Sequence, residues 1–229
     1  MGLTVHHLQI SQSERCVFLC EELGLDYTLK NYPRSPMLAP PEYKALHPLG
    51  QSPVIQDTDR QVTLAESAAC CEYIDAVHGH GQLSIQPGQP GYEAYLYWFH
   101  FVNGTLQPGL ILQMTLQMSG AGSDSPIAQM FEQRSAQAYQ HLDAHLGGTG
   151  PWLAGEKFTL ADIMIMTTLT TMRMFSGRDF SAYGNVLAYV KRVSEREGYQ
   201  RAMKKGDPEL DVQELIAGPA PAAFKPKTG

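Results

Sequence analysis

The sequence carries little positive charge. Its 229 residues include 17 Lys and Arg against 23 Asp and Glu, which gives a formal net charge of -6 at pH 7 and an isoelectric point near 5.7. A chain of this charge has no basic field with which to hold a phosphate backbone. We therefore expect no nucleic acid partner.

Long apolar runs are also missing. The strongly apolar stretches, such as Ile163–Leu169, fall well short of the roughly 20 residues that a membrane-spanning helix needs. The first residues lack the positively charged region and the long apolar region of a secretory signal. The sequence therefore predicts no transmembrane segment and no secretion.

Cysteine is sparse, and its placement excludes two further classes of protein. Four cysteines form two close pairs in apolar stretches, Cys16 with Cys20 and Cys70 with Cys71. This usage excludes a small disulfide-stapled fold and is typical of buried thiols in a reducing compartment. No histidine stands at zinc-type spacing from them. We expect a cytoplasmic protein without a metal site, whose cysteines pack in the core.

Apolar residues are plentiful enough for a substantial core. They make up 43% of the chain, against 17% charged residues, which suits one or two domains. In the N-terminal third, short β-like runs alternate with helical periods, which indicates an α/β unit. The predicted order is strand 3–8, helix 13–23, strand 27–32, short helix 42–46, strands 53–56 and 61–64 as an antiparallel hairpin, and helix 65–77.

The second half of the chain has a different pattern, which is helical nearly throughout. Helices are predicted at 92–118, 126–146, 160–175 and 183–197. Thr159 and Asp162 form a capping box at the start of the third, with Phe158 and Ile163 as a hydrophobic staple. The predicted organisation is an α/β domain over 1–82, a Gly- and Pro-rich linker over 83–91, an all-helical domain over 92–210 and a mobile tail over 211–229.

A proline opens a predicted strand after a polar turn at Gln51, Ser52 and Pro53. Such a proline is a candidate for a cis peptide bond, which exposes the preceding backbone to a ligand. A backbone donor and acceptor presented side by side would hold a peptide-like molecule as an added strand. The alternative is an ordinary trans proline.

Glu66 and Ser67 stand where a predicted strand gives way to a helix. A helix N-terminus offers free amides and partial positive charge to a carboxylate. Ser67 would add a hydroxyl and Glu66 would accept from an ammonium group, so the pair suits an amino-acid zwitterion. The alternative is ordinary helix capping by Ser67.

Ser11 and Ser13 lie in the turn between the first strand and the first helix. A hydroxyl beside the free amides of a helix start would donate to a bound thiolate and lower the pKa of that thiol from about 8.5. The Gly-x-Ser-x-Gly elbow of a serine hydrolase is absent. The alternative role for both serines is helix capping.

These segments, in this order and at these distances, resemble the cytosolic glutathione transferases over nearly the whole chain. Four stretches are similar to the yeast-type GTT group and its bacterial relatives: Leu3–Leu8, Met37–Lys44, His47–Val54 and Tyr95–Phe101. The resemblance implies a thioredoxin-like N-terminal domain, an all-α C-terminal helical domain, glutathione as co-substrate and a homodimer. It implies an enzyme that conjugates the glutathione thiolate to a small apolar electrophile, or that reduces a hydroperoxide.

The resemblance also implies roles in glutathione binding. Ser52 would pair through its backbone with the cysteinyl part of glutathione, and Pro53 falls on the superfamily's cis-proline. Glu66 and Ser67 fall on the pair that holds the γ-glutamyl group. Gln51 stands where relatives often place a lysine for the glycyl carboxylate. This replacement keeps a hydrogen bond but loses a charge.

Ser11 is the implied thiolate-stabilising residue, because it precedes Arg15 by the spacing that theta-like and GTT-like members show. Glu14 departs from the pattern by placing an anion near the proposed thiolate, and like charge raises a thiol pKa. For the electrophile, the resemblance implies a site between the domains, with Tyr97 and Phe101 as candidates. Aromatic residues at helical spacing also suit plain core packing.

Two alternatives to a transferase stay open at this point. A non-catalytic ligand carrier or regulatory module with the same fold would explain Gln51 and Glu14. A thiol-disulfide oxidoreductase would use Cys16, although its thiol lies a turn deeper than the start of the predicted helix. Function lives in the site, so the fold cannot choose among these.

Overall fold

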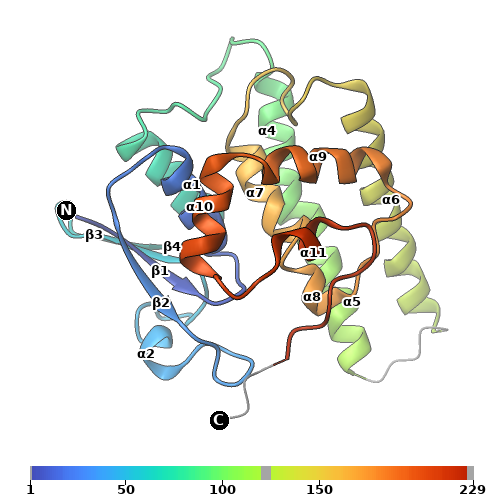
Figure 1. Ribbon diagram of the computed structural model, residues 1–229, viewed down its shortest axis with the longest axis horizontal. Coiled ribbons are helices and arrows are strands. Elements are labelled where there is room, and N and C mark those ends of the chain that lie inside the picture. The colour runs from blue at the N-terminus through green and yellow to red at the C-terminus, as the bar shows by residue number, and fades with distance from the viewer. Residues whose placement is uncertain (1, 120–124, 226–229) are drawn as a thin grey trace. The chain divides into compact units, whose positions relative to one another are not determined.

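The computed structural model describes residues 2–119 and 125–225. The chain forms two compact units: unit 1, Met1–Ser84 with Val193–Val212 and Phe224–Gly229, and unit 2, Ile85–Arg192 with Gln213–Ala223. Unit 1 holds a mixed sheet with helices, and the described part of unit 2 is helical (Figure 1). The predicted fold class, an α/β domain followed by an all-α domain, is confirmed.

The sheet of unit 1 has the strand order β2-β1-β3-β4. β1 (Leu3–Leu8) runs parallel to β2 (Thr28–Tyr32) and antiparallel to β3 (Val54–Asp57), which pairs antiparallel with β4 (Val62–Ala65). Val5 and Ile55 are register partners on the central strands and both are fully buried. The predicted strands and hairpin are confirmed, although β2, β3 and β4 each begin one residue later than expected.

Three helices of unit 1 follow the predicted pattern. They are α1 (Glu14–Glu22), α2 (Pro41–Lys44) and α3 (Ser67–Tyr73), the last continuing into the π-helical turn η1 (Ile74–His78). Both cysteine pairs lie on these helices, α1 and α3, which contact each other. All four thiols are buried and free, as the apolar surroundings in the sequence indicate.

A further helix, α10 (Glu197–Gly206), belongs to unit 1 and lies beside α1 (Figure 1). Its buried positions Tyr199, Ala202 and Met203 recur at helical spacing, which gives it one apolar face. Tyr199 meets Phe18 edge-on at 5.1 Å between ring centroids. The sequence predicts this segment as part of the helical domain over 92–210. By its contacts it groups with unit 1, because its apolar face packs on α1.

Unit 2 contains most of the remaining helices. The stretch predicted as a single helix over 92–118 consists of α4 (Tyr92–Phe101), the π-helical turn η2 (Val102–Leu106) and α5 (Gln107–Met118). It is followed by α6 (Pro126–Gly148), α7 (Leu160–Leu169), α8 (Arg173–Ser176) and α9 (Gly184–Ser194). Ser125 caps α6 by accepting from the Ala128 amide at 3.3 Å, and Pro126 takes the first helical position.

Every residue of α7 is buried, so this helix forms the core of unit 2. The predicted capping box is confirmed, because Asp162 Oδ2 accepts from the Thr159 amide at 2.8 Å and Thr159 Oγ1 accepts from the Ala161 amide. The helix ends earlier than predicted, since Thr170 leaves helical dihedral angles. Its hydroxyl donates to the Met166 carbonyl at 2.7 Å, a local bond that competes with the helical ladder.

The segment after residue 211 is the part of the chain for which the sequence predicts a mobile tail. It contains the short helix α11 (Val212–Ile216), whose Leu215 is buried. The buried Arg173 donates to the carbonyls of Leu215, Ala217, Gly218 and Pro219 at 2.7–2.9 Å. Because a guanidinium offers five donors, one side chain fixes this whole turn. Residues 226–229 of the predicted tail lie outside the described residues.

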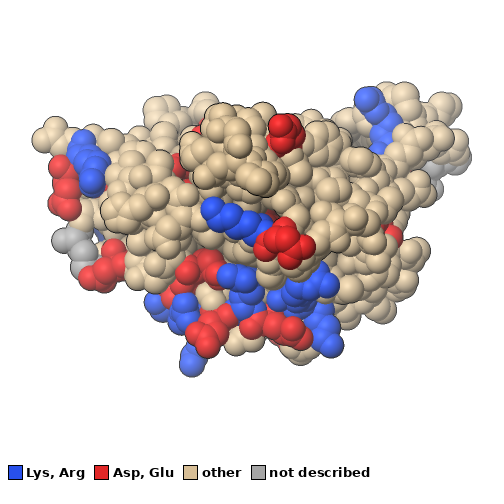
Figure 2. Space-filling view, turned by 90° about the horizontal axis from the view of Figure 1, so that it is seen from above, with Lys and Arg blue, Asp and Glu red and all other residues tan. Residues whose placement is uncertain are grey.

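Acidic and basic side chains are interspersed on the face shown in Figure 2, where they do not gather into a field of one sign. Within unit 1, Arg196 pairs with Glu22, and Arg201 and Lys205 pair with Glu21. Such pairs add little stability individually. Among the described residues, no helix is both long and apolar enough to cross a membrane.

Candidate functional site

The candidate site lies in unit 1, where the chain enters β3 and where β4 gives way to α3. A cavity of about 50 Å³ opens there. The residues predicted to bind glutathione line it together, although they come from two separate segments: Gln51, Ser52, Pro53, Glu66 and Ser67. Gln12, His47, Leu49 and Ala65 complete the wall.

The Ser52–Pro53 peptide bond is cis, as the resemblance implies, so the alternative of an ordinary trans proline is wrong. Pro53 is buried and Ser52 is partly exposed at the cavity. Ser52 precedes the β-ladder, which begins at Val54 through pairing with His6 and Ala65. An extended ligand can therefore meet the backbone of Ser52 just outside the sheet.

Glu66 is held in a left-handed conformation, with φ at 71°, directly before α3. Its side chain is exposed, whereas Ser67 is buried. The Ser67 hydroxyl accepts from Arg15 Nη1 at 2.7 Å and donates to Gln12 Oε1 at 3.1 Å. Ser67 therefore joins α3 to the start of α1, a role beyond the helix capping that the sequence left as an alternative.

Arg15 is a fully buried cation beneath this wall. Burial lowers its pKa to about 10, and the thiol of Cys71 and the carboxylate of Glu14 offset part of that effect. Its Nη1 also donates to Gln12 Oε1 at 2.9 Å. The guanidinium gives this end of the cavity positive potential, which favours a ligand carboxylate.

Ser11 lies just behind Ser52 and is nearly buried, with 6% of its surface exposed. Its Oγ is 2.8 Å from Ser52 Oγ and 2.8 Å from Ser13 Oγ, and it donates to the Leu8 carbonyl at 2.7 Å. Ile10, immediately before it, has a positive φ of 49°. The structure thus brings the predicted thiolate-stabilising hydroxyl to the predicted cysteinyl-binding segment.

The cysteine alternative finds little support in the surroundings of Cys16. The thiol has no exposed surface. Hydrogen bonding to Cys70 and Cys71, together with burial, raises the pKa of Cys16 well above its usual value. A reactive cysteine needs a lowered pKa and access to its partner. Glu14, the predicted anion of this turn, is itself buried.

The two candidates for electrophile binding lie in unit 2, on α4. Tyr97 is about half exposed, at 49%, and Phe101 is buried. Their rings stack with centroids 5.6 Å apart, and Tyr97 hydrogen-bonds His141 on α6 at 3.0 Å. Phe101 lines a cavity of about 450 Å³ within unit 2, together with Leu106 and Phe131. Apolar walls of this kind suit an apolar molecule.

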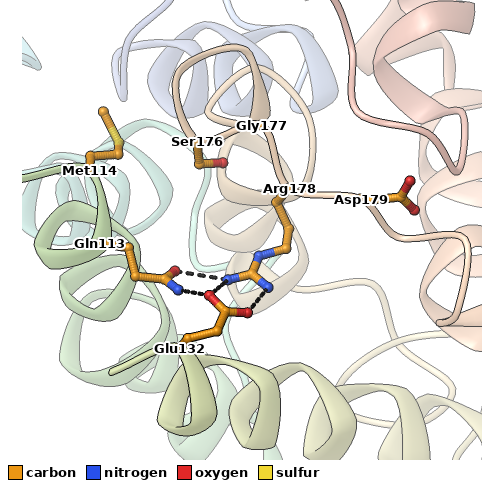
Figure 3. Close-up of a pocket in the computed structure, with 7 residues that line it drawn as sticks. All are labelled: Gln113, Met114, Glu132, Ser176, Gly177, Arg178 and Asp179. Carbon is orange, nitrogen blue, oxygen red and sulfur yellow. Dashed lines mark hydrogen bonds and ion pairs between the residues drawn. The ribbon is translucent and has the colours of Figure 1, made fainter. Parts of the chain in front are cut away.

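A second polar cavity, of about 250 Å³, lies elsewhere in unit 2. Figure 3 shows Gln113 of α5 and Glu132 of α6 turned toward Arg178. Burial alone would lower the pKa of Arg178, but its bonds to Glu132 outweigh burial and raise it. Because Glu132 neutralises this cation, the cluster reads as a structural tie between α5, α6 and the segment after α8.

The sequence did not single out two side chains that line the candidate site, Gln12 and His47, or the supporting position of Arg15. The spacing of Ser11 and Arg15 carried a signal for Arg15, because residues four apart share a helix face. Gln12 and His47 lie outside the regular elements and carry no periodic signal. Among the residues that the structure describes, no cluster of three or more His, Cys, Asp or Glu side chains is arranged to hold a metal ion.

Comparisons with known proteins identify the family of the chain. Residues 11–77 match the family model "Glutathione S-transferase, N-terminal domain", and residues 112–205 match "Glutathione S-transferase, C-terminal domain". A glutathione S-transferase from Actinobacillus pleuropneumoniae has a similar structure, with a TM-score of 0.80 and 30% identity over 92% of this chain and 95% of that one. The chain belongs to the glutathione S-transferase superfamily.

Two further relatives extend the comparison. Glutathione S-transferase 3 of Schizosaccharomyces pombe is 28% identical over 218 residues, covering 89% of this chain and 87% of the relative. A glutathione transferase family member from Pseudomonas fluorescens, whose structure contains two bound glutathione molecules, has a TM-score of 0.73 and 21% identity over 88% of this chain and 92% of that one. The second likeness shows the fold alone.

Proposed function

We propose that the protein binds glutathione at the cavity before α3 and presents its sulfur as a thiolate to a small apolar electrophile. One observation carries this proposal: the five residues implied for glutathione line one cavity, and Ser11 is hydrogen-bonded to one of them. The membership in the superfamily supports it, as does the glutathione bound in the Pseudomonas fluorescens relative.

Each part of the tripeptide has a proposed partner. The exposed Glu66 carboxylate accepts from the γ-glutamyl ammonium group, and Ser67 over the buried Arg15 receives the adjacent carboxylate. The backbone of Ser52 pairs with the cysteinyl residue beside the cis Pro53. Gln51 donates to the glycyl carboxylate as a neutral group.

The chemical step is nucleophilic attack by the glutathione sulfur. The thiol loses its proton, a carbon–sulfur bond forms at the electrophile, and the leaving group departs or the electrophile takes up a proton. Ser11 donates a hydrogen bond to the thiolate and so lowers the barrier to ionisation. Tyr97 and Phe101 contact the apolar electrophile. With a hydroperoxide, the thiolate attacks one oxygen, the O–O bond breaks, and the other oxygen leaves as an alcohol after taking up a proton. The resulting sulfenic acid reacts with a second glutathione to give the disulfide and water.

The ultraviolet difference spectrum of bound glutathione tests the proposal. We expect a thiolate band at neutral pH in the wild type, absent in Ser11→Ala and retained in Ser35→Ala, which removes an exposed hydroxyl of the same unit. Saturating binding without a thiolate band would contradict the proposal. It would favour the second candidate, a non-catalytic ligand carrier or regulatory module.

That second candidate has specific observations behind it. Ser11 already donates to the Leu8 carbonyl, and Gln51 brings no charge to the site.

We further propose that the protein is located in the cytoplasm, assembles as a homodimer and serves in detoxification. The four free thiols support the cytoplasmic location. Sedimentation of the purified protein tests the homodimer, and a monomer would contradict it.

A further inference from the structure

A continuous row of buried side chains leads away from Ser11 into unit 1. Ser11 Oγ lies 2.8 Å from Ser13 Oγ, Ser13 Oγ lies 3.0 Å from His7 Nδ1, and His7 Nε2 lies 3.0 Å from Asp207 Oδ2. Every step is a hydrogen-bond distance. None of the four side chains is more than 6% exposed, and Ser13 is fully buried.

The chemistry of the groups fixes where the protons lie in this row. Asp207 accepts at both oxygens, because Oδ1 also receives the Ile10 amide at 3.1 Å. An ionised carboxylate only accepts, so His7 must carry its hydrogen on Nε2. In a neutral ring His7 Nδ1 is then an acceptor at 3.0 Å from Ser13 Oγ, closer than the other acceptor of the Ser13 hydroxyl, the Leu8 carbonyl at 3.3 Å. Ser13 in turn accepts the Leu8 amide at 3.1 Å.

The imidazole is closely confined by its surroundings. A Cβ at Gly206 would lie 3.1 Å from His7 Nε2, so the bare backbone of α10 packs against the ring. A cavity of about 240 Å³ borders His7 and Asp207. His7 therefore has a fixed orientation that aims its two nitrogens at different partners.

The charged and titratable groups around this ring come from several segments. Asp207 and Glu209 follow α10, and Tyr32 of β2 lines the same cavity as His7. Arg34, which donates to the carbonyls of Gln9 and Ile10, interacts electrostatically with Asp207. His6, the neighbour on β1, is bonded elsewhere, to Tyr32 and Gln56. Glu14 is the nearest acid on α1 to Ser13 along the chain.

We propose that the proton of the glutathione thiol leaves through Ser11 and Ser13 and comes to rest on His7, with Asp207 holding the resulting imidazolium. This inference rests on the proposed function, since it needs glutathione at Ser11. His7, Asp207 and Ser13 act through Ser11, so they are positioning residues for the thiolate. The structure thereby supplies a proton acceptor that a serine alone lacks.

The transfer balances atom by atom. The Ser11 hydroxyl first turns its hydrogen from the Leu8 carbonyl, at 2.7 Å, to Ser13 Oγ, at 2.8 Å. The S–H bond then breaks and its proton joins Ser11 Oγ, while the Ser11 hydrogen passes to Ser13 Oγ and the Ser13 hydrogen passes to His7 Nδ1. The thiol becomes a thiolate, both serines remain neutral hydroxyls, and neutral His7 becomes a cation between the Asp207 carboxylate and Ser13. Each hydroxyl then donates toward the thiolate side of the row, so the new negative charge receives a hydrogen bond from Ser11.

Two substitutions separate this role from simple packing. In His7→Asn, the shorter amide reaches the position of Nδ1 and still bonds to Ser13, but it takes up no proton. In Asp207→Asn, Oδ1 can still accept the Ile10 amide, while the carboxylate charge is lost. The matched control is His78→Asn, because His78 also pairs with a buried aspartate of unit 1, Asp57, at 2.9 Å.

The experiment is a pH titration of the thiolate absorbance with saturating glutathione, alongside thermal melting of each variant. We expect the wild-type midpoint to lie below the value of about 8.5 for a free thiol. His7→Asn and Asp207→Asn should raise it by at least about one unit, which is tenfold less thiolate at a given pH below the midpoint. His78→Asn should titrate like the wild type.

The outcomes distinguish the two proposals. Wild-type midpoints in folded His7→Asn and Asp207→Asn, with the midpoint raised in Ser11→Ala, would overturn the relay and leave the proposed function standing. A wild-type midpoint equal to that of free glutathione would overturn both. If His7→Asn does not fold, Asp207→Asn decides alone, because it keeps the bond to Ile10.

Discussion

Unit 1 contains two buried aspartates that each pair with a histidine, and they are built differently. Asp57 lies in a local hydrogen-bond cluster: its oxygens accept from Arg60, Tyr73 and His78, all within 21 residues along the chain. Asp207 reaches His7, which is 200 residues away along the chain, and the other nitrogen of that ring continues to Ser13. The first arrangement ends at its donors, whereas the second leads to a candidate site.

This difference teaches that the role of a buried His–Asp pair depends on which group contacts the second nitrogen of the imidazole ring. Around Asp57, several donors converge on one carboxylate, which ties β3 to the π-helical turn η1. Around Asp207, donors and acceptors alternate along a line, which is the arrangement that moves a proton. The first pair should therefore affect stability and the second should affect ionisation of the bound thiol.

The largest loss of activity should come from substituting Ser11, the residue of the relay nearest to glutathione. We expect Ser11→Ala to lower kcat/KM by about 10²-fold, the usual loss of one donor to a developing anion. Adding His7→Asn to this variant should lower it little further, because residues of one relay act as a unit. Steady-state kinetics with a model electrophile measure both. A double variant that multiplies the two losses would contradict the shared pathway.

Substituting Ser13, the residue in the middle of the relay, should cause an intermediate loss of activity. Ser13→Ala removes the hydroxyl between Ser11 and His7, and we expect about a tenfold loss in kcat/KM, which corresponds to a rise of about one unit in the pKa of the bound thiol. The control is Ser84→Ala, which removes a hydroxyl that donates to the buried Asp75 at 2.5 Å. Both variants should melt at lower temperature, but only Ser13→Ala should lose activity. Equal activities of the two variants would count against the line.

In the hydrogen-bond cluster around Asp57, a change of pH should alter only the free energy of unfolding. Burial would raise the pKa of Asp57, but hydrogen bonds from Tyr73 and His78 outweigh it and lower the pKa. A depressed pKa stabilises the fold above the unfolded value of about 3.9 and loses that contribution as pH falls through the folded value. Urea unfolding at a series of pH values should show this acid loss in the wild type and not in Asp57→Asn.

The thiolate titration should be the same in Asp57→Asn and in the wild type. A raised midpoint in this variant would show that the two aspartates are coupled, and it would weaken the contrast between them.

The smallest effect should appear at the mouth of the site. Gln51→Lys adds a charge-assisted contact to the glycyl carboxylate, and an exposed pair of this kind contributes roughly 0.2–1 kcal/mol. We expect KM for glutathione to fall by about threefold at low salt and by less at high salt. Gln61→Lys places the same charge on an exposed position of unit 1 away from the cavity and should leave KM unchanged. A matching change in both variants would indicate long-range attraction only.

Much of unit 1 was predictable from its sequence because its signals are local. Alternating apolar residues and turn formers predicted the strands and the hairpin. A local signal of the same kind in unit 2, Thr159 with Asp162, predicted the start of α7. The residues proposed to bind glutathione owe their individual roles to the resemblance, because periodicity carries no such information. The structure then joined Ser11, Ser52 and Ser67 to neighbours from other segments.

What could not be predicted depends on contacts between distant parts of the chain. The helix α10 has an apolar face that suits either domain, and only its packing on α1 decides between them. His7 reads as a strand residue and Asp207 as a residue after a helix. Their pairing crosses the chain from one end to the other, so no spacing or motif announces it.

The most direct test of the relay is the ionisation state of His7 itself. Nitrogen NMR distinguishes neutral and protonated imidazole rings, and His7→Asn identifies the His7 signals among those of the eight histidines. We expect a neutral ring with its hydrogen on Nε2 in the free protein, and an imidazolium once glutathione is bound at neutral pH. S-methylglutathione, which has no thiol proton to give, should bind and leave the ring neutral. A ring that stays neutral with bound glutathione thiolate would contradict the transfer to His7.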